Sequence, residues 1–276
     1  MENVNKTLFI PLYGKSQVSK QGIILNDTMA EKIWKEEAFP IHGKSKSKWL
    51  TYNMAMRARV FDDWTTAMLR LNKDALVLHI GCGLDSRCLR IKEPYRRWID
   101  GDFQDVITLR KKYYEESECY QMRVFDASDA KQVELLPDSD TVIVILEGIS
   151  MYLTKEQINR LFLALQEKYS NIHILMDVYT EFAAKASKYK NPVNDVGVVT
   201  LWGIDDIRSV LTNTEMKVVE EHSFTPPNLV DELKPFDRAF FKMMFTGSLY
   251  RKLYRLWELE GNCNERKYCG KADCKG

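Results

Sequence analysis

Short runs of apolar residues alternate with amphipathic stretches over residues 75–177 of this 276-residue chain. Leu76 to Ile80 is apolar except for His79, residues 141–146 read TVIVIL, and residues 172–177 read IHILMD. Runs of this length predict buried strands rather than helices, and a near-continuous β-branched run is typical of a central parallel strand covered on both faces. The pattern therefore predicts an α/β fold with a doubly wound, mostly parallel sheet.

The first 72 residues show helical patterns and no clear strand. Asn26 or Asp27 is placed to cap one helix, and a longer helix is expected from about Trp49 to Leu71, where apolar residues recur at helical spacing. We therefore expect three parts of the chain: a helical N-terminal cap over 1–72, a ligand-binding domain over 73–260 with a lid insertion at about 178–202, and a flexible tail over 261–276.

A glycine turn follows the first predicted strand. Gly81 and Gly83 break the strand, and residues from Leu84 onward can start a helix, which would aim backbone N–H groups and a positive dipole end at one spot. Asp102 lies nineteen residues beyond Gly83, where an acid can reach the hydroxyls of a ribose. Alone, the motif fits an adenosine-type cofactor and an ordinary strand-turn-helix equally well, and Ser86 departs from the nicotinamide fingerprint.

The segments GCGLDSRCLRI, IDGDFQDVITLR and ILEGISMYLTKEQI resemble those of the S-adenosylmethionine-dependent leucine carboxyl methyltransferase family, above all its bacterial branch of polyketide-type O-methyltransferases. The family pattern reads roughly GxGLDTRxxRL, then D-x-D-x-P leading into a helix, then EGxxMYL. All three motifs occur in order, and the resemblance covers about residues 7–210. The departures are Cys82 for the usual Ala, Ser86 for Thr, and Gln104 for a proline whose loss loosens the turn after Asp102.

The resemblance implies a Rossmann-like class I methyltransferase with a mostly parallel seven-stranded sheet, helices on both faces and a helical N-terminal cap. It also implies S-adenosyl-L-methionine as cofactor and S-adenosyl-L-homocysteine as product. Without the family, Arg57 and Arg59 would be assigned to a solvated helix face. The family keeps an arginine there that grips the methionine carboxylate, and Arg59 fits that pattern better than Arg57, with Lys15 as a second cation. The cofactor-binding residues that follow are Lys15, Arg59, Gly81, Cys82, Gly83, Asp102, Phe103, Asp126, Ala127 and Glu147.

Two acids of this set stand at the ends of predicted strands. Asp126 ends the third strand, where it suits either an adenine amino group, with the backbone of Ala127 also contacting the base, or a simple turn. Glu147 follows the central strand at the edge where open α/β sheets bind ligands. Asp177, at the end of the next strand, fits substrate binding and a turn equally well.

Composition narrows the class of protein further. With 40 basic and 39 acidic residues the net charge is +1, so nothing calls for nucleic acid or an anionic membrane as partner. No apolar run approaches the roughly 18 residues of a membrane span, and the first residues do not read as a signal peptide, so a cytoplasmic protein is expected. The tail cysteines Cys263, Cys269 and Cys274 lack a C-x-x-C spacing, which favours a solvated tail over a metal site.

The predicted function is S-adenosylmethionine-dependent O-methyl transfer to a carboxylate or hydroxyl of a small molecule. The alternatives are carboxyl methylation of a protein C-terminus, a nicotinamide-dependent oxidoreductase, and a cofactor-binding protein without activity. Tyr152 is the candidate for positioning the acceptor, whereas no residue stands out as a general base and His79 reads as a core residue. The sequence assigns no oligomeric state.

Overall fold

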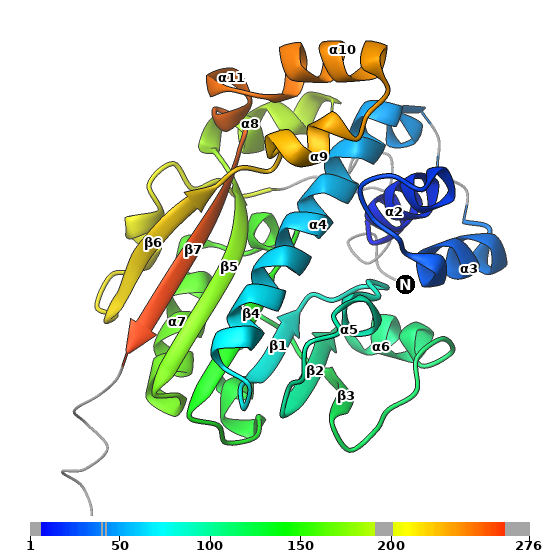
Figure 1. Ribbon diagram of the computed structural model, residues 1–276. Coiled ribbons are helices and arrows are strands. Elements are labelled where there is room, and N and C mark those ends of the chain that lie inside the picture. Colours follow the sequence, from blue (N-terminus) through cyan, green and yellow to red (C-terminus); the bar gives the residue numbers. More distant parts are fainter. Residues whose placement is uncertain (1–6, 40, 42, 191–200, 263–276) are drawn as a thin grey trace, which may run out of the picture.

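The structure is a computed structural model that describes residues 7–39, 41, 43–190 and 201–262. These residues form a seven-stranded sheet with the strand order β3-β2-β1-β4-β5-β7-β6. All neighbouring pairs are parallel except those of β7, which runs antiparallel between β5 and β6 (Figure 1). The strands are β1 (Leu76–Ile80), β2 (Arg97–Asp102), β3 (Tyr120–Val124), β4 (Thr141–Leu146), β5 (Asn171–Tyr179), β6 (Met216–His222) and β7 (Tyr254–Asn262).

Helices cover both faces of the sheet, with α4 lying across one face and α7 on the other (Figure 1). The α-helices are α2 (Phe9–Gln21), α3 (Thr28–Glu37), α4 (Lys48–Leu71), α5 (Arg87–Arg90), α6 (Gln104–Arg110), α7 (Lys155–Lys168), α8 (Glu181–Lys190), α9 (Pro227–Asp231), α10 (Pro235–Phe245) and α11 (Ser248–Arg251). Short 3₁₀ helices are η1 (Gly43–Lys46), η2 (Ala130–Leu135), η3 (Ser150–Tyr152) and η5 (Ile207–Val210). No helix in this described part of the chain is long and apolar enough to cross a bilayer.

The central strands send alternate side chains into two apolar layers, because successive residues of a strand point to opposite faces. Val77 and Ile143 pack on the side of α4, whereas Leu78 and Val144 pack with α7 residues such as Leu161. All these strand residues are fully buried. The strand order reverses between β1 and β4, and a ligand site is expected at the carboxyl ends of strands at such a point.

Two helix starts are capped by side chains, and the first of them confirms a cap that the sequence predicted. The Asp27 carboxylate accepts a hydrogen bond from the backbone N–H of Ala30 at 2.8 Å and caps α3. Thr154 and Gln157 form the capping box of α7. These caps fix where each helix leaves the preceding loop, and the α7 cap follows directly on the loop after β4.

The helix expected from Leu84 is corrected by the structure. It begins only at Arg87 and makes a single turn to Arg90, because the Asp85 carboxylate accepts from the Arg87 backbone N–H at 2.6 Å and holds the preceding residues in a turn. One turn is too short to supply the dipole that the sequence suggested. Of the lid expected at 178–202, residues 178 and 179 end β5 and α8 follows, whereas 191–200 lie outside the described residues, as do the three tail cysteines.

Candidate functional site

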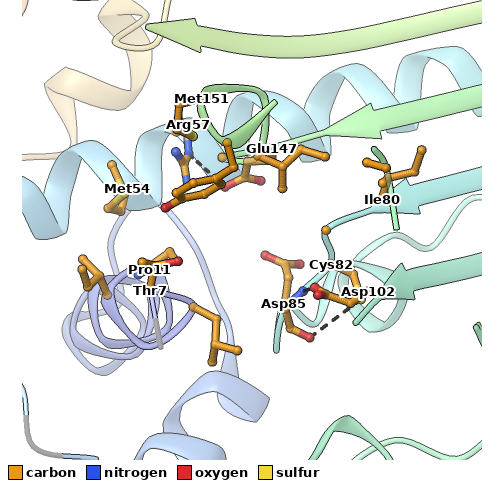
Figure 2. A pocket seen from close by; sticks show the side chains of 18 of the residues that line it. Thr7, Pro11, Met54, Arg57, Ile80, Cys82, Asp85, Asp102, Glu147 and Met151 are labelled. Atoms are coloured by element: carbon orange, nitrogen blue, oxygen red, sulfur yellow. Dashed lines mark hydrogen bonds and ion pairs between the residues drawn. The ribbon is translucent and has the colours of Figure 1, made fainter. Parts of the chain in front are cut away.

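A cavity of about 700 Å³ opens at the carboxyl ends of β1, β2, β3 and β4, beneath α2 and the first half of α4. Its volume lies in the range of small-molecule sites. Figure 2 shows Arg57 and Glu147 on one side, Cys82, Asp85 and Asp102 on another, and Thr7 and Pro11 on a third. All predicted cofactor residues except Arg59 line it: Lys15, Gly81, Cys82, Gly83, Asp102, Phe103, Asp126, Ala127 and Glu147.

The glycine turn provides space rather than free hydrogen-bond donors. Gly81 has φ +68°, and a Cβ there would lie 2.1 Å from Cγ2 of Ile149. The N–H groups of Gly81 and Cys82 both donate to the carbonyl oxygen of Gly101, at 2.8 and 3.2 Å. The N–H of Gly83 donates to Asp102 at 2.7 Å. The expectation that these N–H groups aim at a ligand is therefore corrected, because the fold already uses them.

Asp102 closes this turn from the end of β2. Its carboxylate accepts hydrogen bonds from the backbone N–H groups of Gly83 and Phe103, both at 2.7 Å. Burial raises the pKa of Asp102 to about 6, and the two N–H groups offset this only in part. A carboxylate held in this way keeps free lone pairs on the cavity side, where ribose hydroxyls would be suitable donors.

Asp126 and Ala127 form the wall beyond β3. The Asp126 carboxylate accepts from the backbone N–H of Ser128 at 2.8 Å, which makes it a turn residue. It also lines the cavity together with Ala127 and Ser128. The two alternatives that the sequence left open for Asp126 are thus compatible, because one oxygen serves the turn and the side chain still faces the cavity.

The structure separates the two arginines of α4. Arg59 lies outside the cavity, where it pairs with Asp63 at 2.8 Å and donates to the Ile24 carbonyl at 3.0 Å. Arg57 lines the cavity and is 6 % exposed. The expectation for Arg59 is corrected on this geometry. Residues that are two positions apart on a helix point about 200° away from each other, so only one of the two arginines can face the site.

Arg57 is held by three partners and leaves one edge free. Its Nε donates to Glu147 at 3.0 Å, and its Nη1 donates to Asp177 at 3.1 Å and to the Tyr254 hydroxyl at 2.7 Å. Its Nη2 donates to no group in the described part of the chain. A fixed guanidinium with a free N–H edge suits an incoming carboxylate.

Asp177 and Tyr254 are site residues that the sequence did not assign. Asp177 has no exposed surface, accepts also from the Gly148 N–H at 2.7 Å, and receives the Tyr254 hydroxyl. Burial raises the pKa of Asp177, and Arg57 counteracts the shift. The sequence left substrate binding and a turn open for Asp177; in the structure its carboxylate orients Arg57 from behind the cavity wall.

Glu147 lies between two buried arginines, Arg57 and Arg87. Burial alone would raise its pKa, but the coulombic effect of Arg87 and Arg57 lowers the pKa of Glu147 to about 2. Glu147 is therefore ionised and committed to holding cations. Arg87 belongs to the GLDSR segment on which the family resemblance rests, so its position was a signal for a role that the sequence analysis did not assign.

Lys15 joins the N-terminal cap to the glycine turn. Its ammonium forms a buried ion pair with Asp85. Burial raises the pKa of Asp85, but the cations Arg90 and Lys15 outweigh burial and hold it well below the ordinary range. Arg90 also pairs with Asp27 and Asp62, so this network ties α2, α3 and α4 to the site.

The cavity has a second end with a different character. Its walls there are apolar and aromatic side chains from α4, η3, β5, α8 and the segment before β7. Tyr152, the candidate for positioning an acceptor, lies here, and burial raises its pKa. The residues that make up this end, called the acceptor end below for its proposed role, are Leu50, Asn53, Met54, Tyr152, Tyr179, Ala183, Ala186, Ser187, Tyr250, Leu253 and Tyr254.

Outside the cavity, three potential metal ligands approach one another on β6 and β7. The ligand atoms of Glu220, His222 and Glu258 all lie within 4.8 Å. His222 Nε2 lies 2.6 Å from Glu258, and this hydrogen bond raises the pKa of His222. The pairing explains the cluster as an ion pair on the sheet.

The sheet order, with the glycine turn after β1 and acids at the ends of β2, β3 and β4, is that of the class I methyltransferase fold. Residues 5–166 match the leucine carboxyl methyltransferase family. The chain belongs to this family and is an S-adenosylmethionine-dependent O-methyltransferase, as the sequence predicted.

Two curated relatives and one solved structure place the chain among known proteins. It is 25 % identical over 244 residues to the tetracenomycin polyketide synthesis O-methyltransferase TcmP of Streptomyces glaucescens, covering 86 % of this chain and 89 % of the relative. It is 26 % identical over 247 residues to the S-adenosyl-L-methionine-dependent methyltransferase dpfgK of Gibberella zeae, covering 81 % and 83 %. The fold resembles magnesium protoporphyrin IX methyltransferase from Synechocystis PCC 6803 with bound S-adenosylhomocysteine (TM-score 0.50, 12 % identity, 90 % and 100 % coverage).

Proposed function

We propose that the charged end of the cavity holds S-adenosylmethionine through named residues of this chain. Arg57, through its free Nη2 edge, and Lys15 would hold the carboxylate of the methionine part. Asp102 would accept the ribose hydroxyls, and Asp126 with Ala127 would face the adenine. The residues fit the cofactor because its one carboxylate meets cations and its hydroxyls meet a carboxylate. Phe103, Gly81, Cys82 and Gly83 complete the wall.

We further propose that the acceptor is a small aromatic molecule whose reacting oxygen is already ionised, as in a carboxylate. The observation that carries this is the chemistry of the acceptor end, where the described residues offer apolar groups, hydroxyls and an amide but no acid or histidine to act as base. Carboxylates at the other end are bound to cations or backbone N–H groups. The naming of one relative for polyketide synthesis supports a small molecule over a protein C-terminus.

S-adenosylmethionine supplies an activated methyl group. The contribution of this chain is to align the two reactants and to exclude water, which can lower the barrier by several kcal/mol. The buried arginine network fixes the cofactor end, and the tyrosines and α8 would close the acceptor end. An acceptor that arrives ionised needs no proton transfer to a side chain.

The cofactor assignment is tested by calorimetric titration with S-adenosylhomocysteine and, separately, with NADH. We expect binding of the first in the micromolar range or tighter and none of the second. NADH binding without S-adenosylhomocysteine binding would overturn the assignment.

The acceptor assignment is tested by the release of S-adenosylhomocysteine over a panel of probes: aromatic carboxylic acids, the matching aromatic alcohols, and a peptide ending in leucine. We expect turnover of the aromatic acids, with a rate at saturating S-adenosylmethionine that is independent of pH once the acid itself is ionised. A rate that requires a second ionisation in the enzyme even at saturating S-adenosylmethionine, or turnover of the peptide alone, would overturn this proposal while leaving the cofactor assignment intact.

A further inference from the structure

One polar side chain at the acceptor end has a hydrogen-bond donor without a partner. Asn53 is 4 % exposed and lines the cavity. Its Oδ1 accepts a hydrogen bond from the Tyr250 hydroxyl at 2.9 Å. Its Nδ2 is shielded from solvent and bonds to no group in the part of the chain that the structure describes. The amide is therefore satisfied on one edge only.

An unsatisfied buried donor is costly, since it has lost its hydrogen bond to water without gaining another. Such groups are rare in folded proteins and call for a specific explanation. Tyr250 holds the amide firmly, because its ring packs edge-on against Phe224 and Phe245 at centroid distances of 6.3 and 6.1 Å. The tyrosine hydroxyl donates to the amide oxygen, so the NH₂ group is the part of the amide that remains without a hydrogen bond.

The position of Asn53 relates this donor to the reaction. It precedes Arg57 by four residues on α4, which is about one turn or 6 Å along the helix axis. Leu50, Asn53, Met54 and Arg57 all line the cavity, so the same face of α4 passes from the cofactor end to the acceptor end (Figure 2 shows Met54 and Arg57). A ligand group at Asn53 is therefore separate from the groups that Arg57 holds.

We propose that Asn53 is a specificity-determining residue whose amide NH₂ donates a hydrogen bond to a carbonyl oxygen of a planar aromatic acceptor. This inference rests on the proposed function and names a second oxygen, on the ring system, in addition to the one that is methylated. An NH₂ group only donates, so its partner must be an acceptor atom. A neutral carbonyl suits the apolar surroundings better than a charged group.

The surrounding walls favour a flat ring system. Tyr179 and Tyr254 both line the acceptor end, and their rings meet edge to face with centroids 4.9 Å apart. Aromatic ligands pack well on such edges and faces. The amide nitrogen has no exposed surface in this structure, so a ligand would reach it only if the lining side chains shift. Met54 beside Asn53 lines the cavity, and its unbranched side chain adapts readily. A ring system without the carbonyl would leave the donor unpaired and would bind more weakly for that reason.

The test uses two probes with the same carboxylate and ring skeleton: anthraquinone-2-carboxylate, which has ring carbonyls, and anthracene-2-carboxylate, which has none. Each is titrated into protein saturated with S-adenosylhomocysteine. We expect wild type to bind the quinone at least tenfold more tightly. This preference for the quinone is lost in Asn53→Ala and in Asn53→Asp. Tyr250→Phe reduces the preference in part, because the amide is no longer oriented.

Met54→Leu is the matched control, since it changes the wall next to Asn53 without touching the amide. It should alter the affinity of both probes by similar factors and preserve their ratio. Binding of S-adenosylhomocysteine within twofold of wild type shows that each variant is folded. Equal binding of the two probes to wild type, binding of neither, or a preference that survives in Asn53→Ala would overturn the proposal. Because S-adenosylhomocysteine binding is measured separately, such a result leaves the methyltransferase assignment in place.

Discussion

The two ends of the cavity are built on different physical principles. At the cofactor end, Arg57 and Lys15 meet Glu147, Asp177 and Asp85 in buried ion pairs, and the ligand meets groups that are already fixed. At the acceptor end, apolar and aromatic side chains dominate. On the proposed assignment, the comparison teaches that charge would fix the position of the common reactant, whereas shape and a single polar group would select the variable one.

The largest effect is expected from the cation that faces the cavity. Arg57→Met should weaken S-adenosylhomocysteine binding at least a hundredfold, about 2.7 kcal/mol, because it removes the free N–H edge. It should also lower the free energy of unfolding by about 3–5 kcal/mol, since Glu147 and Asp177 lose their partner. Calorimetry and denaturant unfolding measure the two effects.

Arg59→Met is the control, because Arg59 lies on the same helix with its charge outside the cavity. Binding within twofold of wild type is expected. If Arg59→Met weakened binding as strongly as Arg57→Met, the division between the two arginines would be wrong.

The next effect is a pH dependence of cofactor binding from Asp102. Its pKa is raised to about 6, so the folded protein retains a proton that the unfolded chain has released, and the contribution of Asp102 to stability falls as pH rises from its ordinary pKa to about 6. The ionised form is the better acceptor for ribose hydroxyls. S-adenosylhomocysteine should therefore bind up to about tenfold more weakly at pH 5 than at pH 7. In Asp102→Asn this dependence should disappear, and its persistence there would assign the effect to another group.

A smaller effect is expected from a hydroxyl at the cavity wall beside Arg57. Tyr254→Phe removes one hydroxyl that Arg57 and Asp177 share, which is worth about 1 kcal/mol, or severalfold in S-adenosylhomocysteine affinity. Tyr179→Phe, whose ring touches that of Tyr254, is the comparison variant and should change the affinity less. Equal losses would indicate that the Tyr254 hydroxyl has no special part in orienting Arg57.

The smallest effect on the cofactor is expected from filling the acceptor end. Ala183→Trp, on α8, should leave S-adenosylhomocysteine binding within twofold and abolish binding of anthraquinone-2-carboxylate. Loss of both ligands would show that the two ends are not separable. Titration of each ligand alone and in sequence distinguishes these outcomes.

Residues close in the sequence were predictable, and residues brought together by the fold were not. The glycine turn, Asp102, Asp126 and Glu147 follow directly on strands, so strand patterns and spacing placed them at one edge of the sheet. The choice of Arg59 over Arg57 failed because both fit a helical pattern and only the packing of α4 on the sheet decides which one faces inward.

The remaining parts depend on contacts across long stretches of chain. Asp177 and Tyr254 meet because β5 and β7 are neighbours, and Tyr250 meets Asn53 across 197 residues. No local sequence pattern predicts contacts between residues so far apart in the chain. The single-turn helix at Arg87 was also missed, because a side-chain hydrogen bond from the turn itself decides where that helix begins.

The place of β7 in the sheet has a consequence for the order of assembly during synthesis. β7 is the last described strand in the chain, yet it lies between β5 and β6. The earlier β6 therefore lacks its native partner strand until the ribosome has released the segment that begins at Tyr254. A nascent chain cut short before residue 254 would hold Arg57 without the Tyr254 hydroxyl, so both the sheet and the set of partners around Arg57 are completed only by this late segment.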